Sequence, residues 1–324
     1  MSFRLVICYF LNNNKLYINI IYSISLNYDR RVFFYRFDQG RLPDTFNYLY
    51  KKDQMEIKHY PSGNTALYSF NTSEAPKAVI LLVHGLGEHA GRYEGWAARF
   101  NERGVALRAF DLPGHGNSEG RRGVIAFPEK VFDTIDKISE EIVTEFPGVP
   151  LFLYGHSLGG GIVLNYLVRR RPELKGAIVT SSWLLLSETP PRGKALLANV
   201  AKKLMPGFTQ PSGLNTEFLS RDPEIVTAYR KDPLVHGQIS AGLYGWVSYA
   251  AAETLARASE ISVPLLLVHG RNDMIISPAS SVRVAEAAPR ATLKLWDEGY
   301  HELHNDLLRD EHFDFITEWI DTLI

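Results

Sequence analysis

The chain has 324 residues, of which 45% are hydrophobic and 22% charged, and its formal net charge is −1. This length and composition exclude a wholly disordered chain and supply enough apolar residues for a large buried core. Because the net charge is close to zero, nothing attracts the whole chain to nucleic acid, and we expect no nucleic-acid partner. Cys8 is the only cysteine, which rules out an intrachain disulfide and a cysteine-rich metal site. We expect a cytoplasmic protein.

Residues 1–54 differ in composition from the rest of the chain, because they are rich in Asn, Tyr, Ile and Phe and contain no alanine. The apolar run Leu5–Leu11 follows Arg4 as in a signal peptide, but no small-residue cleavage site comes after it. It is also much shorter than the roughly 20 apolar residues of a membrane helix. We therefore expect a dispensable N-terminal extension and a domain over 55–324, with Met55 as the candidate natural start. A weak membrane-associated leader is the alternative.

From Met55 onward the pattern predicts an α/β fold. The stretch "MEIKHYPSGNTALYSF" predicts a hairpin, after which apolar strand segments alternate with helical ones. The predicted strands are Val79–His84, Val105–Asp111, Leu151–Gly155, Gly176–Thr180, Pro264–Gly270 and Thr292–Trp296. The predicted helices are Tyr93–Arg103, Phe127–Glu145, Leu158–Arg170, Pro278–Ala287 and Glu311–Leu323. This alternation is typical of a mostly parallel central sheet with helices on both faces. It stops over 181–260, where several Pro, Gly and aromatic residues predict an inserted helical cap.

The segment "LFLYGHSLGGG" places Ser157 two residues from a glycine on either side. A strand that turns at once into a helix forces unusual backbone angles on the turning residue, and glycines on each side remove the resulting collisions. G-x-S-x-G therefore predicts a nucleophile elbow with an exposed Ser157 hydroxyl. The alternative is a glycine-rich helix start with an incidental serine.

Two later loops supply partners for this serine. Asp273 follows the strand in "VPLLLVHG", and His301 follows the strand in "TLKLWDEG". The order Ser, Asp, His is the order of an α/β-hydrolase triad. We expect His301 to take the proton of Ser157, and Asp273 to orient the imidazole and stabilise its charge. A loop-capping carboxylate and a surface histidine are the alternative interpretations.

Other residues compete for these roles. His304 lies a turn beyond His301, and Asp297 also ends a strand, but it is awkwardly close in sequence to the histidine. We favour His301 and Asp273. His156 should point away from the serine and serve packing, and His115 in "DLPGHGNSEG" is expected to stabilise a turn.

A tetrahedral intermediate needs hydrogen-bond donors for its oxyanion, and backbone N–H groups are already fixed before the charge develops. The N–H of Leu158, directly after the nucleophile, is one candidate. The N–H of Leu86 in "LLVHGLGEH" is the other. Gly85 and Gly87 serve the tight turn in the same loop.

The segments "HGLGEHAGRYEGWAARF", "DLPGHGNSEGRRG", "YGHSLGGGIVL", "VPLLLVHGRNDMIISP" and "GYHELHND" together resemble the monoacylglycerol lipase and lysophospholipase group of α/β-hydrolases. The resemblance covers residues 55–324. It implies a serine carboxylester hydrolase that works through an acyl-enzyme and needs no metal or organic cofactor. It also implies that Glu88 and Arg92 lie near the pocket end that receives the alcohol part of the substrate. A structural salt bridge between these two residues is the alternative.

In that group a helical cap guides the lipid chain of the substrate. "LLANVAKKLM" places Leu196, Leu197, Val200 and Leu204 on one helical face, which either packs on the main domain or lines an acyl channel. We favour packing and keep Leu204 as a candidate substrate contact. The run "AGLYGWVSYAAAETLARA" predicts a helix that leads back to the sheet.

Cap aromatics could touch a membrane surface transiently, so we expect a lipid-like ester substrate and a cytoplasmic or membrane-peripheral location. A broad-specificity short-chain carboxylesterase is the main alternative, followed by an aminopeptidase or an acyltransferase. A binding protein that has lost its chemistry is the remaining one. The sequence does not indicate an oligomeric state.

Overall fold

The computed structural model describes the backbone of residues 2–12, 15–26, 29–38, 55–59, 65–72, 74–188 and 204–324, and the side chains of residues 56–58, 65–72, 74–188 and 204–324. The chain divides into two compact units, Met1–Asp53 and Gln54–Ile324. The smaller unit contains an antiparallel sheet of β1 (Ser2–Asn12), β2 (Lys15–Leu26) and β3 (Asp29–Asp38), with β2 in the middle. The apolar run considered as a leader thus lies in β1.

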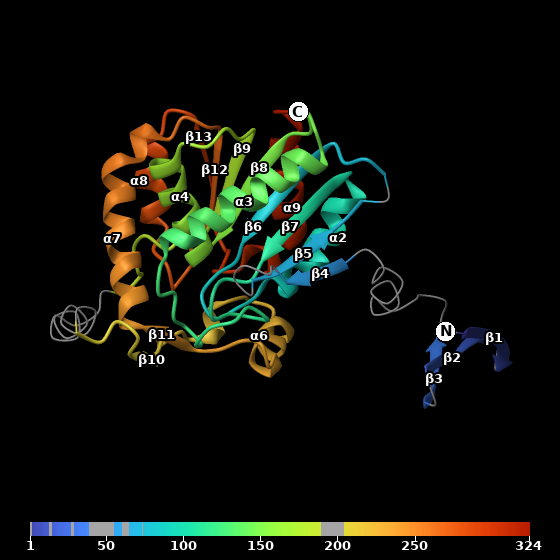
Figure 1. Ribbon diagram of the computed structural model, residues 1–324. Helices are drawn as coiled ribbons and strands as arrows, with labels where there is room; N and C mark the ends of the chain where they lie inside the picture. The colour runs from blue at the N-terminus through green and yellow to red at the C-terminus, as the bar shows by residue number, and fades with distance from the viewer. Residues whose placement is uncertain are drawn as a thin grey trace. The chain divides into compact units, whose positions relative to one another are not determined.

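The larger unit is built on an eight-stranded sheet with the order β13-β12-β9-β8-β6-β7-β5-β4 (Figure 1). Only the edge next to β7 is antiparallel, through the β4–β5 hairpin, and the other neighbours are parallel. The strands are β4 (Met55–His59), β5 (Ala66–Phe70), β6 (Ala78–Val83), β7 (Val105–Phe110), β8 (Leu151–His156), β9 (Gly176–Thr180), β12 (Leu265–Gly270) and β13 (Ala291–Trp296).

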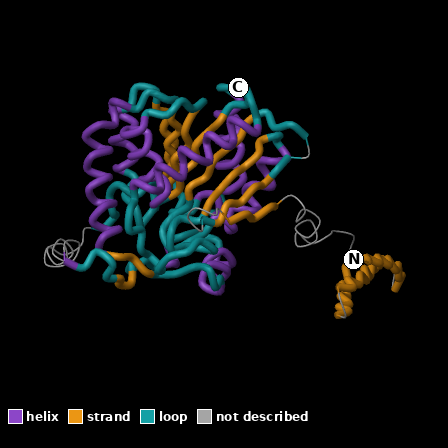
Figure 2. Tube along the Cα trace, in the orientation of Figure 1, coloured by secondary structure: helices purple, strands orange, loops and turns teal. Residues whose placement is uncertain are grey.

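Helices cover both faces of this sheet (Figure 2). They are α2 (Glu94–Glu102), α3 (Glu129–Glu145), α4 (Leu158–Arg170), α7 (Ala241–Arg257), α8 (Ala279–Ala287) and α9 (Arg309–Asp321). Alternate residues of a strand point to opposite faces, so β6 serves two cores. Val79 and Leu81 join the core with α3, α4, α7 and α8, whereas Ile80 joins the core with α2 and α9.

The predicted hairpin and the strands and helices predicted on described residues are present, with ends that coincide or differ by at most two residues. The predicted α/β class with a mostly parallel sheet is confirmed. The largest shifts at a helix start are of two residues, in α3, which begins at Glu129 instead of Phe127, and in α9, which begins at Arg309 instead of Glu311. Such shifts are expected, because the ends of an element depend on local capping more than on apolar periodicity.

The segment predicted as the cap contains β10 (Thr209–Pro211), α6 (Pro223–Lys231) and β11 (Gln238–Ser240), followed by α7. Residues 189–203 lie outside the described residues, and with them the predicted face of Leu196, Leu197 and Val200. The helix predicted over 241–258 is α7, whose Leu243 and Val247 are buried. Asn165 of α4 donates to Thr254 of α7 over 3.2 Å, so α7 packs on the main domain. Among the described residues, no helix is both long and apolar enough to cross a membrane.

Candidate active site

Ser157 occupies a strained turn between β8 and α4, with φ 53° and ψ −115°. Its two flanking glycines are sterically required. A Cβ on Gly155 would lie 2.6 Å from the carbonyl oxygen of Gly159, and one on Gly159 would lie 2.0 Å from that of Val83. Any side chain at either position would force the turn open. The local geometry is that of a nucleophile elbow.

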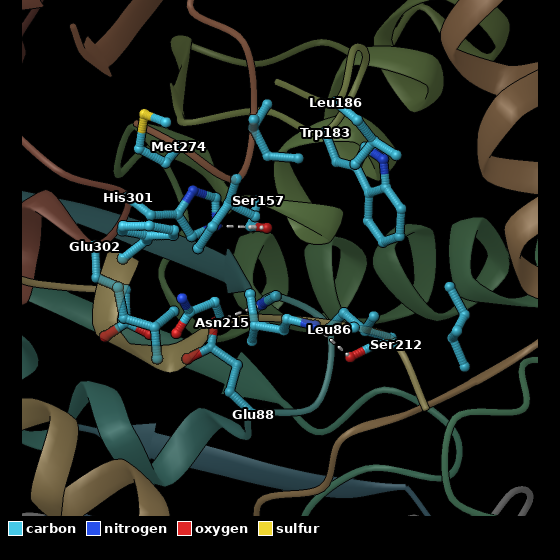
Figure 3. Close-up of a pocket in the computed structure, with 18 of the residues that line it drawn as sticks. Leu86, Glu88, Ser157, Trp183, Leu186, Ser212, Asn215, Met274, His301 and Glu302 are labelled. Atoms are coloured by element: carbon cyan, nitrogen blue, oxygen red, sulfur yellow. Dashed lines mark hydrogen bonds between the residues drawn. The ribbon is translucent and has the colours of Figure 1, made fainter. Parts of the chain in front are cut away.

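Three side chains form a continuous hydrogen-bonded chain at this turn, and Figure 3 shows two of them, Ser157 and His301. The distance from Ser157 Oγ to His301 Nε2 is 2.9 Å, and that from His301 Nδ1 to Asp273 Oδ2 is 2.7 Å. The Nδ1–H group donates to the carboxylate, which leaves Nε2 free to accept the serine hydroxyl proton. The three residues follow β8, β12 and β13. They meet because parallel strands bring their carboxyl ends to one edge of the sheet.

Further contacts hold the acid and the imidazole in place. Asp273 Oδ1 accepts the N–H groups of Ile275 and Ile276 over 2.8 and 2.9 Å, so the carboxylate also caps its own loop. His269 Nε2 lies 3.1 Å from Asp273 Oδ2. The sequence interpretation missed His269, although it stands in "LLVHGRND" four residues before the aspartate. Ser181 Oγ donates to the carbonyl oxygen of His301 over 2.8 Å.

Charges set the protonation states of this pair. Burial alone would raise the pKa of Asp273, but the facing His301 and hydrogen bonds from His269 and His301 outweigh it and hold the pKa well below its usual range. Burial alone would lower the pKa of His301, and the Asp273 carboxylate more than reverses this, so the pKa of His301 is raised. Asp273 is therefore ionised, and an imidazolium at His301 is stabilised.

The rival residues lie elsewhere. His304 stacks on Tyr93 with ring centroids 4.8 Å apart and does not reach the serine. Asp297 pairs with Arg271 at the surface. His156 turns to the Thr180 hydroxyl, 3.0 Å from its Nδ1. The Nδ1 of His115 lies 3.0 Å from the Pro113 carbonyl oxygen, consistent with the expected turn.

The two candidate oxyanion donors flank the serine. Leu158 is the first residue of α4, where amides have no partner within the helix. Leu86 follows β6 in a loop that lies against the nucleophile, since a Cβ on Gly85 would be 3.2 Å from Ser157 Cβ. Neither amide donates a backbone hydrogen bond to another described residue.

Glu88 and Arg92 belong to a buried ion-pair network. Arg92 pairs with Glu88 over 2.7 Å and makes a two-pronged contact with Glu302 over 2.7 and 2.8 Å. Its guanidinium also lies 4.7 Å from the ring centroid of Tyr229. Glu88 Oε1 accepts the Gly85 N–H over 2.6 Å. Arg92 thus forms the salt bridge that was the alternative interpretation, and it does not itself line the cavity, whereas Glu88 and Glu302 do. The role of Arg92 as a substrate contact stays a prediction.

A cavity of about 620 Å³ opens beside Ser157. In Figure 3, Trp183 and Leu186 lie on one side of the serine, and Glu88 and Glu302 on the other. Other apolar and aromatic residues that line the cavity are Leu86, Pro211, Leu214, Phe218, Leu219, Tyr229, Ile239, Tyr244, Met274, Ile275 and Ile276. Polar residues, among them Gln210, Ser212 and Asn215, line it as well. Leu204 is not among its lining residues, and 75% of its surface is exposed. The structure therefore does not place Leu204 in the cavity wall, and its assignment as a substrate contact stays a prediction.

The fold and this site define an α/β-hydrolase: a parallel sheet with a serine elbow after β8, and with the acid and histidine in later loops. The family model described as serine aminopeptidase, S33, matches residues 74–307. The chain belongs to this family.

Several proteins that this chain resembles are named as lipases. The monoacylglycerol lipase of Mycolicibacterium smegmatis is 33% identical over 76% of this chain and 88% of its own length. The crystal structure of Paleococcus ferrophilus monoacylglycerol lipase matches with a TM-score of 0.73 and 34% identity, over 83% of this chain and all of that one. An uncharacterized abhydrolase domain-containing protein of Dictyostelium discoideum is 35% identical over 79% of this chain, which spans only 27% of that protein.

Proposed function

We propose that this protein is a serine carboxylester hydrolase that cleaves monoacylglycerol-like or lysophospholipid-like esters through an acyl-enzyme. Ser157 is the nucleophile, His301 the general base and acid, and Asp273 the residue that orients the imidazole. The observation that carries the proposal is the Ser157–His301–Asp273 hydrogen-bond chain beside a cavity whose walls are more apolar than polar. The lipase relatives support the same substrate class.

Acylation follows from this geometry. Ser157 Oγ attacks the ester carbonyl carbon while its proton passes to His301 Nε2, only 2.9 Å away. The carbonyl oxygen becomes an oxyanion, which the N–H groups of Leu86 and Leu158 stabilise. His301 then gives its proton to the leaving alkoxide oxygen, the alcohol departs, and the acyl group stays on Ser157.

Deacylation uses the same groups in reverse. His301 takes a proton from water, the hydroxide attacks the acyl carbon, and His301 returns the proton to Ser157 Oγ as the fatty acid leaves. The ionised Asp273 stabilises the imidazolium in both steps, in agreement with the raised pKa of His301.

The test is to measure how fast the purified protein hydrolyses monoacylglycerols, lysophospholipids and p-nitrophenyl esters of graded chain length. Amino-acid p-nitroanilides serve as the probe for aminopeptidase activity. We expect the long-chain glycerol or lysophospholipid esters to be cleaved and the anilides to remain intact. Turnover of the anilides alone, or of short esters alone, would contradict the proposed substrate class.

Variants test the assigned roles. Ser157→Ala should abolish hydrolysis while the circular dichroism spectrum stays that of the wild type. Ser182→Ala is the matched control, because the hydroxyl of Ser182 is buried without a partner among the described residues. His301→Ala should lose activity severely and His304→Ala far less. The opposite order would show that His304 is the base.

The pH dependence gives a separate test. His301 must be neutral to accept the serine proton, so kcat/KM should fall as the pH drops through the raised pKa of His301. The acidic limb should therefore have its midpoint above 6.5, the ordinary value for an imidazole. A midpoint clearly below 6.5 would contradict the Asp273–His301 electrostatics.

A further inference from the structure

One cap element contacts both loops that the proposed reaction uses. We call Phe218–His236, which is α6 with its two flanks, the α6 brace. On its N-terminal flank, the Glu302 N–H donates to the Leu219 carbonyl oxygen over 2.8 Å. Arg221 bonds Asp306 through Nε at 2.8 Å and through Nη2 at 2.6 Å. This flank is therefore fixed to the loop that carries His301.

The C-terminal flank of the α6 brace is fixed to the loop that carries Leu86. The His236 N–H donates to the Gly87 carbonyl oxygen over 2.8 Å. His89 Nε2 lies 2.8 Å from Asp232 Oδ2. Gly87 has φ +78°, and a Cβ there would be 2.2 Å from the His236 carbonyl oxygen, so the two backbones touch. These contacts act on the residues directly after Leu86.

Asp232, the partner of His89, is itself held by a contact within its own segment. It caps the C-terminal end of α6, and its Oδ1 accepts the Leu234 N–H over 2.9 Å. Its other oxygen is left for His89. Burial would raise the pKa of Asp232, but the hydrogen bonds from His89 and Leu234 lower it below its usual value, so the carboxylate is ionised.

The oxyanion loop, Gly85–His89, needs such support because it contains two glycines. Glu88 holds it from the protein interior through the Gly85 N–H, and Arg92 connects Glu88 to Glu302. The α6 brace holds the same loop from the cap side. An oxyanion donor acts only at the correct distance from the developing charge, and a misplacement of about 1 Å can cost roughly a hundredfold in rate.

We propose that Asp232 is a positioning residue: through His89, and together with the His236–Gly87 hydrogen bond, it holds the oxyanion loop in the geometry that stabilises the transition state. The cap therefore completes the catalytic site in addition to covering it. This inference rests on the proposed function, because it assigns a role within that reaction.

The decisive variant is Asp232→Asn, which removes the charge and keeps the size of the side chain. Asp222→Asn is the matched control at the other end of α6. There Asp222 Oδ1 caps the helix by accepting the Glu224 N–H over 3.0 Å, which asparagine does equally well, and Oδ2 pairs with Arg309 of α9 over 3.1 Å. The control therefore also removes a charged contact of α6, but one that does not involve the loop carrying Leu86. For Asp232→Asn we expect kcat to fall about 10- to 100-fold with KM within about twofold of wild type. The control should stay within about twofold in both constants.

Two further measurements separate positioning from a general structural effect. The affinity of Asp232→Asn for a trifluoromethyl ketone, a transition-state analogue, should fall by the same factor as kcat, while binding of an uncleavable alkyl ether of glycerol is unchanged. Amide hydrogen exchange over residues 84–92 should be faster in Asp232→Asn than in wild type, and unchanged in Asp222→Asn.

The proposal would be overturned if Asp232→Asn kept the wild-type kcat and the wild-type affinity for the ketone. It would also be overturned if kcat fell equally in Asp232→Asn and Asp222→Asn. Exchange does not depend on turnover, so it distinguishes two failures. A wild-type protein that hydrolyses no ester refutes the proposed function, whereas unchanged exchange in Asp232→Asn refutes the positioning role.

Discussion

His312 provides a direct test of how burial controls stability. Its ring is fully buried, stacks on Trp96 with centroids 5.5 Å apart, and has no hydrogen-bond partner on either nitrogen among the described residues. Burial lowers its pKa to about 3. The unfolded chain, with a pKa near 6.5, therefore binds a proton at pH 5 that the folded chain does not, and stability falls as the pH drops below about 6.5.

The size of this effect follows from the interval between pH 6.5 and pH 5. At about 1.36 kcal/mol per pH unit, His312 costs roughly 2 kcal/mol of unfolding free energy at pH 5 relative to pH 8. His312→Phe keeps an aromatic ring against Trp96 and cannot titrate. The difference in unfolding free energy between His312→Phe and wild type should therefore be about 2 kcal/mol more favourable to the variant at pH 5 than at pH 8.

The measurement is the free energy of unfolding in urea at both pH values. Phe313→Leu is the control, because Phe313 is buried next to His312 but does not titrate. The loss of stability in Phe313→Leu should therefore be the same at pH 5 and pH 8. If His312→Phe changed stability equally at pH 5 and pH 8, the histidine would not be buried as a neutral group.

Five other histidines have pKa values lowered chiefly by burial, so wild type should unfold readily in acid. They are His84, His115, His156, His236 and His304.

Three further predictions follow from backbone geometry and the two units. Gly159→Ala should destabilise the protein by several kcal/mol in thermal or urea unfolding, because the added Cβ would lie 2.0 Å from a backbone oxygen of β6. The control is Gly95→Ala in α2, where an added Cβ would have nothing within 4 Å, and this variant should be neutral or stabilised by up to about 1 kcal/mol. A chain that starts at Met55 should melt and turn over like the full chain, and aggregation or lost activity would show that residues 1–54 support the core. Leu204→Trp should leave the dependence of kcat/KM on acyl-chain length unchanged, because Leu204 is exposed. Leu186→Trp should shorten the preferred acyl chain, because Leu186 lies in the cavity wall. The reverse result would place the acyl chain against Leu204.

The features that the sequence determined by itself are those set by neighbours along the chain. The elbow needs Gly155, Ser157 and Gly159 within five residues, and the clash that Gly155 avoids, with the carbonyl oxygen of Gly159, lies inside this segment, so the spacing is enough to predict the turn. The clash that Gly159 avoids, with Val83 of β6, became visible only in the tertiary structure. The strand and helix alternation likewise follows from apolar periodicity, and the parallel sheet then places every strand's carboxyl end at one edge. The sequence could therefore nominate Asp273 and His301 from their loops alone.

Only the tertiary structure decided which of several nearby side chains reaches which partner. His301 and His304 are three residues apart, and the direction of each side chain, which packing sets, brings His301 to Ser157 and His304 onto Tyr93. Arg92 pairs with Glu88 four residues before it, as the sequence allowed, but its second partner, Glu302, lies 210 residues further along the chain.

The α6 brace shows the same dependence on packing. The contact of Asp232 with His89 spans 143 residues and exists only because α6 lies over both loops. No local pattern encodes such contacts, since their free energy arises when distant segments pack together and remove each other from water.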